Sequence, residues 1–301
     1  MAKVALLLKE KQRLPLPAPR AAAPNDPVFH RAPTLKIVCW NTLKLRLDAP
    51  TLREQWTEAI ALLAEHDVIV LQEVPGSRTL FRTRVELELL TRLHAAAPKA
   101  AWQLVHSRPS PPQQEVHVLI VRKPLRVVAQ TTIATLGSQP LEHAPLVCTI
   151  EVPQFRGAVR FLNIVSVHLP PSSSRRRSAR NAQFQALVGR YPHSAEHNLG
   201  RPVRLQAVRE AQQQSARTLH VFCGDFNASA TEMRALGLGA ETWKTIVTAP
   251  TSSGGKQYDN FVVQREVLEA HFTYGYDVYN LTSPANFKTR VTGVSDHAPI
   301  A

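Results

Sequence analysis

Apolar runs of strand length alternate with amphipathic stretches of helical length along much of the chain. The first strand is predicted at residues 35–40, where Leu-Lys-Ile-Val-Cys-Trp reads as a buried run. Residues 51–54, Thr-Leu-Arg-Glu, form a capping box directly after Pro50, and they predict the start of a helix. A second strand is predicted at residues 67–72 and a second amphipathic helix at residues 78–95.

The later part of the chain adds more strands than helices. A long polar segment, residues 172–217, interrupts the strand pattern, and residues 203–216 within it have a helical pattern. The further predicted strands are residues 101–106, 115–122, 125–130, 145–152, 158–168, 219–223, 258–263 and 296–300. Paired strand runs with helices between them predict an α/β or α+β sandwich in a single domain.

The first 34 residues differ from the rest of the chain. They are rich in proline and alanine and contain six Lys/Arg, so we expect residues 1–34 to be a disordered basic tail and residues 35–301 to form the domain. The apolar run at residues 4–8 is shorter than the ~7–15 residues of a signal-peptide core, which argues against a secretory signal. An organelle transit peptide stays open, although Glu10 and Asp26 argue against it.

Composition narrows the class of protein. Hydrophobic residues make up 44% and charged residues 20% of the 301 residues, which is typical of a globular protein. No run of 18 uncharged apolar residues exists, so we expect neither a membrane-spanning helix nor a membrane partner. The three cysteines are isolated, which argues against a disulfide scaffold or a cysteine zinc site. We therefore favour an intracellular location, cytoplasmic or nuclear, and expect a monomer.

The positive charge is concentrated in two segments. Of the net charge of +13, residues 1–34 carry +4 and residues 172–220 carry +7, so only +2 remains for the rest of the chain. Such a distribution favours a polyanionic partner that touches the protein in two places. Two solubilising segments would give the same pattern, and that alternative stays open.

Polar side chains stand where the predicted strands begin or end. They are Asn41, Glu73, Glu115, His168, Asp225, Asn227, Asp259, Asp296 and His297. Taken singly, an Asx residue after a strand more often caps a turn, and a lone histidine is more often a core or surface residue. The whole set indicates a site, because strand ends are where a rigid scaffold presents side chains into a cleft.

These residue types match the hydrolysis of a phosphodiester. The reaction needs a hard divalent cation, and magnesium prefers one or two carboxylates and oxygen ligands such as those of Glu73, Asn41 and Asp296. It also needs a base for water and an acid for the leaving oxygen, which histidines oriented by carboxylates can supply.

Six motifs, in this order, resemble those of the endonuclease/exonuclease/phosphatase superfamily. The motifs are Trp40-Asn41, Leu71-Gln72-Glu73-Val74, Ser166-Val167-His168, Gly224-Asp225-Phe226-Asn227, Tyr258-Asp259 and Ser295-Asp296-His297-Ala298-Pro299-Ile300. The resemblance covers residues 35–301, and the Gly-Asp-Phe-Asn and Ser-Asp-His motifs are specific as a pair.

The resemblance implies a fold and a metal site. The fold would be a four-layer α/β sandwich of two packed mixed β-sheets flanked by helices. The reaction would be Mg²⁺-dependent cleavage of a phosphoester, with Mn²⁺ or Ca²⁺ as substitutes. Glu73 and Asn41 would bind the metal with the support of Asp296, and Asp225 and Asn227 would position the nucleophile and the phosphate.

The resemblance also implies roles for the two histidines. His168 and His297 would flank the scissile phosphate, with His297 as the base and His168 as an acid or a phosphate ligand. Glu115 would pair with His168, and Asp259 would lie on the other side of the site.

Within the superfamily, the chain looks most like the deoxyribonuclease I branch. A Glu opens and an Arg closes the strand at residues 115–122, as in that branch, and residues 257–263 point the same way. Pro75 and Asn260, however, stand where those nucleases carry arginine. Arginines of the polar segment could replace the missing phosphate contacts, unless this segment is only a solvated insertion. They are Arg175, Arg176, Arg177 and Arg180.

The leading prediction is a Mg²⁺-dependent endonuclease that hydrolyses DNA. One alternative is a phosphoesterase of the same superfamily that acts on RNA, a phosphoinositide or another phosphoester. The other is a non-catalytic nucleic-acid-binding protein with this fold.

Overall fold

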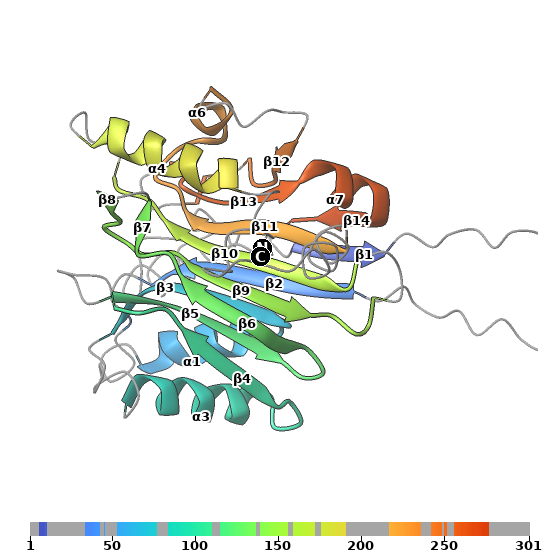
Figure 1. Ribbon diagram of the computed structural model, residues 1–301. Helices are drawn as coiled ribbons and strands as arrows, with labels where there is room; N and C mark the ends of the chain where they lie inside the picture. Colours follow the sequence, from blue (N-terminus) through green and yellow to red (C-terminus); the bar gives the residue numbers. More distant parts are fainter. Residues whose placement is uncertain are drawn as a thin grey trace, which may run out of the picture.

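Two six-stranded β-sheets pack face to face, and helices cover both outer faces (Figure 1). This arrangement is seen in a computed structural model. The structure describes residues 6–10, 34–42, 45, 53–76, 84–109, 115–136, 139–155, 159–171, 176–190, 217–235, 242–248, 250–251 and 256–276.

The first sheet has the strand order β14-β1-β2-β3-β5-β4. Its strands are β1 (Leu6–Glu10), β2 (Thr34–Asn41), β3 (Val68–Pro75), β4 (Trp102–His106), β5 (Glu115–Arg122) and β14 (Phe272–Gly275). The central strands β2 and β3 are parallel, whereas β5 runs antiparallel to β3. The sheet is therefore mixed, as the resemblance implied.

The second sheet repeats this arrangement with the strand order β12-β13-β11-β10-β9-β6. Its strands are β6 (Arg126–Thr132), β9 (Leu146–Glu151), β10 (Phe161–His168), β11 (Thr218–Asp225), β12 (Trp243–Thr245) and β13 (Asp259–Gln264). Strands β10 and β11 are parallel, and β13 runs antiparallel to β11. The short strands β7 (Thr135–Leu136) and β8 (Gln139–Pro140) form a separate two-stranded sheet.

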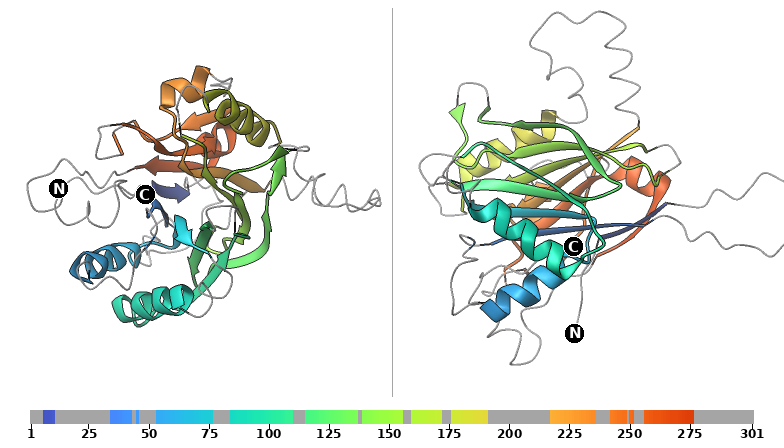
Figure 2. Two further views of the ribbon diagram at one scale, coloured as in Figure 1. Left: turned by 90° about the vertical axis from the view of Figure 1, so that its left-hand side faces the viewer. Right: turned by 90° about the horizontal axis from the view of Figure 1, so that it is seen from below.

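Helices complete the outer two layers. Helices α1 (Arg53–Leu63) and α3 (Glu86–Ala96) bury their apolar sides, including Trp56 and Leu89, against the outer face of the first sheet. Helix α4 (Arg177–Arg190) covers the second sheet with Phe184 and Leu187. The short helices α6 (Ala230–Ala235) and α7 (Arg265–His271) lie on the side of the second sheet. Figure 2 shows α1 and α3 on one side of the strands and α4 and α6 on the other.

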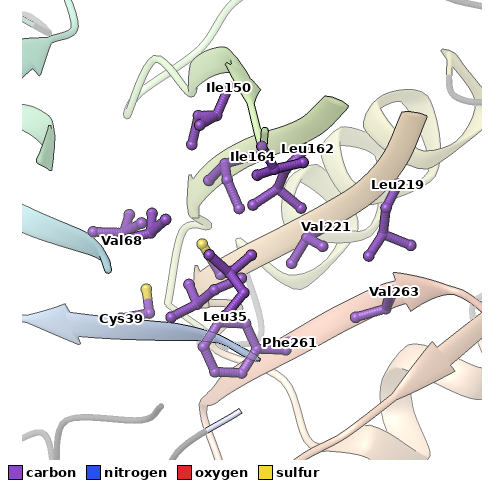
Figure 3. Packing of buried hydrophobic residues seen from close by; sticks show 14 of the residues in the cluster. Leu35, Cys39, Val68, Ile150, Leu162, Ile164, Leu219, Val221, Phe261 and Val263 are labelled. Atoms are coloured by element: carbon purple, nitrogen blue, oxygen red, sulfur yellow. The ribbon is translucent and has the colours of Figure 1, made fainter. Parts of the chain in front are cut away.

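The alternation of side chains along each strand explains why the sheets pack in layers. On β2, Ile37 and Cys39 belong to the core between the sheets, whereas Val38 and Trp40 pack with the helices outside. Successive side chains of a strand point to opposite faces, so an uninterrupted apolar strand can face two apolar layers at once. In Figure 3, Cys39 and Val68 of the first sheet face Ile164 of the second.

The structure confirms the predicted four-layer sandwich and most of the predicted elements, and it adds two that were not predicted. Within the tail expected to be disordered, Leu6–Glu10 forms strand β1, which pairs with both β2 and β14. Within the polar segment, helix α4 begins at Arg177, whereas the helix predicted for this segment covered residues 203–216. The predicted helix at 203–216 and strand at 296–300 lie outside the described residues. None of the described helices combines the length and apolar composition that crossing a membrane requires.

Deleting residues 1–10 should destabilise the protein. The deletion removes β1 and leaves the edges of β2 and β14 without their hydrogen-bonding partner. We expect the midpoint of thermal unfolding to fall by more than about 5 °C, measured by circular dichroism. Deletion of residues 1–5 is the control, because it leaves β1 in place. Equal midpoints for the two truncated proteins would show that β1 adds nothing to stability.

Candidate functional site

The predicted site residues gather at one end of the sandwich because of the strand directions. Strands β2 and β3 end there and the antiparallel β5 begins there. In the second sheet, β10 and β11 end and β13 begins at the same end. A hydrogen bond of 3.3 Å from Asn41 Nδ2 to Asp225 Oδ2 joins the two sheets at this point.

The inward-facing positions change from apolar to polar toward this end. The series are Ile37, Cys39, Asn41; Val68, Val70, Gln72; Leu119, His117, Glu115; Ile164, Ser166, His168; Val221, Cys223, Asp225; and Val263, Phe261, Asp259. Each series advances by two residues, which keeps its members on one face of the strand. The site is therefore the polar end of the core between the sheets.

Asn41 holds two carboxylates together. Its Nδ2 atom donates to Glu73 Oε1 at 2.9 Å and to Asp225 Oδ2 at 3.3 Å. Asn41 and Asp225 are almost fully buried, and charged groups in such a place need hydrogen-bond partners. The amide thus links a residue of β3 to a residue of the other sheet.

Glu73 reaches the site through a break in the regular geometry of β3. Its φ is 54°, and the pairing of β3 with β5 shifts register between Leu71 and Val74. In a regular strand, Glu73 would point to the opposite face from Gln72. A β-bulge re-aims a side chain in this way, and a non-glycine residue with positive φ stores about 1–3 kcal/mol of strain.

The Gly-Asp-Phe-Asn motif ends β11 and forms the tight turn that follows it. A Cβ atom on Gly224 would lie 2.0 Å from the backbone oxygen of Val167, so only glycine fits beside β10. Asp225 Oδ1 accepts the backbone N–H of Asn227 at 2.8 Å. Asn227 has φ 47° and donates from Nδ2 to the backbone oxygen of Leu169 at 2.7 Å. The turn fixes both side chains relative to the end of β10.

His168 lies beside both carboxylates. Its Nε2 atom is 3.7 Å from Glu73 Oε1 and 3.9 Å from Asp225 Oδ2. Asp259 pairs with Asp225 across β11 and β13, and its backbone N–H donates to Thr251 Oγ1 at 3.0 Å. Because β11 lies between β10 and β13, Asp259 is placed on the other side of Asp225 from His168.

The structure adds His143, which the sequence reasoning missed. Its Nδ1 atom is 3.7 Å from Glu115 Oε2, and its ring stacks on His168 with 3.9 Å between ring centroids. Glu115 was expected to pair with His168, and His143 here contacts both. Strand ends did not reveal His143, because it stands three residues before the start of β9 at Leu146, whereas Glu115 is the first residue of β5.

The predicted arginines have different environments. Arg176 and Arg177 are exposed at the start of α4, and Arg176 forms a 2.8 Å ion pair with Glu142. Arg180 is buried, and its guanidinium donates to the backbone oxygen of Asn227 and to Asn181 Oδ1. This burial corrects the prediction that Arg180 contacts nucleic acid. The remaining predicted site residues, Arg175, Asp296 and His297, lie outside the described residues.

A buried polar network lies beneath the site. His117 Nδ1 and Ser166 Oγ are 2.7 Å apart, and Gln72 Nε2 donates to Ser166 Oγ at 3.2 Å and to Cys39 Sγ at 3.0 Å. Burial lowers the pKa of His117 to about 3, and burial also lowers the pKa of His143. Both imidazoles are therefore neutral near pH 7.

Comparison with known proteins identifies the family. The model of the Endonuclease/Exonuclease/phosphatase family matches residues 38–297. The chain belongs to this family. Its members are in general metal-dependent hydrolases, and the predicted family assignment is confirmed. No match was found among the curated proteins.

Solved structures show the same fold. TDP2 of D. rerio complexed with single strand DNA product has a TM-score of 0.55 at 14% identity, over 88% of this chain and 96% of that chain. A family protein from Leptotrichia buccalis C-1013-b has a TM-score of 0.55 at 14% identity, over 88% and 97%. At these identities the likeness shows the deoxyribonuclease I-like fold alone.

The donor set suits a hard divalent cation. The carboxylates of Glu73 and Asp225 and the amide oxygen of Asn41 come from two sheets that are joined at this point. Oxygen ligands of this kind fit Mg²⁺, Mn²⁺ or Ca²⁺.

Neutral His117 should make the protein sensitive to acid. Its folded pKa of about 3 is below the ordinary value of 6.5, so the unfolded chain takes up the extra proton and stability falls as pH drops below 6.5. Replacing His117→Gln should reduce the slope of unfolding free energy against pH by about 1.4 kcal/mol per pH unit between about pH 4 and pH 6. Urea titrations measure this slope.

The control is Ser166→Ala, which removes the partner of the imidazole but keeps the titrating group. This variant should retain a slope close to the wild-type one. If His117→Gln also retained the wild-type slope, His117 would not be buried in the neutral form.

Proposed function

We propose that the protein is a Mg²⁺-dependent phosphodiesterase, an endonuclease that hydrolyses DNA. The observation that carries this proposal is the convergence of Asn41, Glu73, His168 and Asp225 from four strands of two sheets. Asn41 and His168 each approach both carboxylates, at distances of 2.9–3.9 Å. A structural role alone would not require two carboxylates and an imidazole at the polar end of a core, where their burial costs free energy.

Glu73 and Asn41 would hold the metal ion, with Asp296 in support. A bound divalent ion supplies charge neutralisation for the phosphate oxygens. Asn41 would keep the Glu73 and Asp225 carboxylates at a fixed separation, because its amide group donates to both. The strained backbone of Glu73 holds its carboxylate in place before any ligand arrives.

The remaining residues would orient the reaction. Asp225 and Asn227 would position the attacking water and the phosphate, with His297 as the base. His168, between two carboxylates, would donate a proton to the leaving oxygen or bind the phosphate. Asp259 would complete the other side of the site.

Charge near the site favours a nucleic acid as the substrate. The ion pair of Arg176 with Glu142 brings the start of α4 next to the segment that carries His143. Arg177 is also exposed there, and Lys/Arg contacts to phosphates position a duplex. A TDP2 of this fold was solved with a single-stranded DNA product, which adds support for DNA.

Replacing Glu73→Gln should abolish metal-dependent cleavage. The amide keeps the shape of the side chain but removes the negative charge that would bind the cation. With supercoiled plasmid and Mg²⁺, we expect the wild-type protein to produce nicked circles and the variant to lose at least about 100-fold of this rate. EDTA should stop the wild-type reaction.

The control for this experiment is Glu65→Gln, at an exposed glutamate just after α1, which should cleave at the wild-type rate. Cleavage by Glu73→Gln at the wild-type rate would refute the metal site. An absence of cleavage at every Mg²⁺ concentration would move the substrate to RNA, a phosphoinositide or another phosphoester. DNA binding without any cleavage or Mg²⁺ requirement would indicate a non-catalytic binder.

The exposed arginines at the start of α4, Arg176 and Arg177, should contribute to the salt dependence of DNA binding. Each phosphate contact adds about 0.9 to the slope of log affinity against log salt for duplex DNA. Combining Arg176→Ala and Arg177→Ala should therefore reduce the slope by about 1–2, measured by fluorescence anisotropy in the Glu73→Gln background. Arg126→Ala is the control, because Arg126 pairs with Glu151 at the opposite end of the second sheet. If the double variant had the same slope as the protein without these two substitutions, Arg176 and Arg177 would not contact DNA phosphates.

A further inference from the structure

We propose that Glu115, His143 and His168 form a second cation site, which takes a divalent transition metal such as Zn²⁺. The site adjoins the oxygen donors of Glu73 and Asn41 but differs from them in donor chemistry. One oxygen or nitrogen ligand atom of each of the three side chains lies within 4.8 Å of the other two, and all three residues are buried.

The separations are close to those of a chelate. Two donors bonded to one zinc ion at about 2.0–2.1 Å in tetrahedral geometry lie about 3.3 Å apart. His143 Nδ1 and Glu115 Oε2 are already 3.7 Å apart. The rings of His143 and His168 stack with an interplanar angle of 25°, so binding requires one imidazole to rotate until both rings point at the ion.

The donors select the class of metal. Two imidazoles and one carboxylate suit Zn²⁺, Co²⁺ or Fe²⁺, whereas Mg²⁺ prefers oxygen ligands and retains several waters. Three protein ligands leave a coordination position open for water or a substrate oxygen, as in catalytic zinc sites. When Mg²⁺ and Zn²⁺ are both present, Mg²⁺ would therefore bind at the neighbouring oxygen site and Zn²⁺ at this site.

The fold places two of the three donors on strands and the third just before a strand. Glu115 opens β5 in the first sheet and His168 ends β10 in the second. The strands β9 and β10 pair from Ser166 and Leu146 onward, so His143 before β9 and His168 after Ser166 emerge at the same end. The two sheets and the segment before β9 thus hold the donors within reach before the ion binds.

Occupation of this site would inhibit the enzyme, a consequence that rests on the proposed function. His168 belongs to both groups of residues, because its Nε2 atom is 3.7 Å from Glu73 Oε1. The imidazole nitrogen that binds Zn²⁺ carries no proton, so through that atom His168 could not donate to the leaving oxygen or to the phosphate. Micromolar Zn²⁺ would then slow hydrolysis that millimolar Mg²⁺ supports.

Zinc binding tests the site without any activity measurement. The full chain is titrated with Zn²⁺ against a chromophoric chelator in excess Mg²⁺, which keeps the oxygen site filled. We expect one equivalent of Zn²⁺ to bind to the wild-type protein, and His143→Asn and Glu115→Gln each to weaken it at least about tenfold. Circular dichroism shows whether each variant is folded.

Two matched variants control for other zinc ligands. His94→Asn, at an exposed histidine of α3, and Glu73→Gln, in the oxygen site, should both retain the wild-type zinc affinity. Co²⁺ should give visible absorption bands of a nitrogen-coordinated ion with the wild-type protein but not with His143→Asn. Equal zinc affinity of folded His143→Asn and wild type would overturn the site, as would loss of the zinc in Glu73→Gln.

The inhibition is tested separately by plasmid nicking with and without Zn²⁺ at fixed Mg²⁺. Zn²⁺ should slow nicking by the wild-type protein at least about tenfold, and it should slow nicking by His143→Asn by a smaller factor. Zinc binding without any nicking activity would leave the cation site standing and refute the proposed function. Nicking that Zn²⁺ inhibits equally in both proteins would refute the regulatory role of this site.

Discussion

The packing of two sheets through one shared interior is the constraint on which the other features depend. Side chains that alternate along β2, β10 and β11 face the same interior, and these positions are apolar until the last residues before the strands end. Buried polar groups need hydrogen-bond partners. Asn41 is the partner of two carboxylates here, because its amide donates to Glu73 in the same sheet and to Asp225 in the other sheet. The candidate site is thus continuous with the core, so its geometry is as rigid as the packing beneath it.

Local pattern was sufficient to predict the parts of the site that belong to strands. Asn41, His168 and Asp225 could be predicted because a polar residue ends an apolar run, and the two-residue period places it on the inner face. His143 lies in the segment before β9, where no period applies, and only the pairing of β9 with β10 brings it to the site. Burial of Arg180 depends likewise on a distant partner, the backbone of Asn227.

The same distinction applies to the fold. The central strands follow from composition, because apolar runs of that length have to be buried on both faces. Strand β1 could not be predicted in this way, because five residues between charged and proline-rich stretches carry little local signal. Its position depends on pairing with β2 and with β14, which lies more than 260 residues away along the chain. Helix α4 similarly owes its place to Phe184 and Leu187, which pack on the second sheet.

The position of β1 between β2 and β14 has a consequence for biosynthesis. A ribosome makes Leu6–Glu10 before their neighbour Phe272–Gly275, and more than 260 residues are added between the two paired strands. The first sheet therefore cannot close at this edge while the chain is being made, and β1 has only β2 to pair with until then. Contacts between residues this far apart in sequence form slowly, and an unpaired strand edge is prone to aggregation. A nascent chain of this protein would thus benefit from a chaperone that shields β1 until β14 arrives.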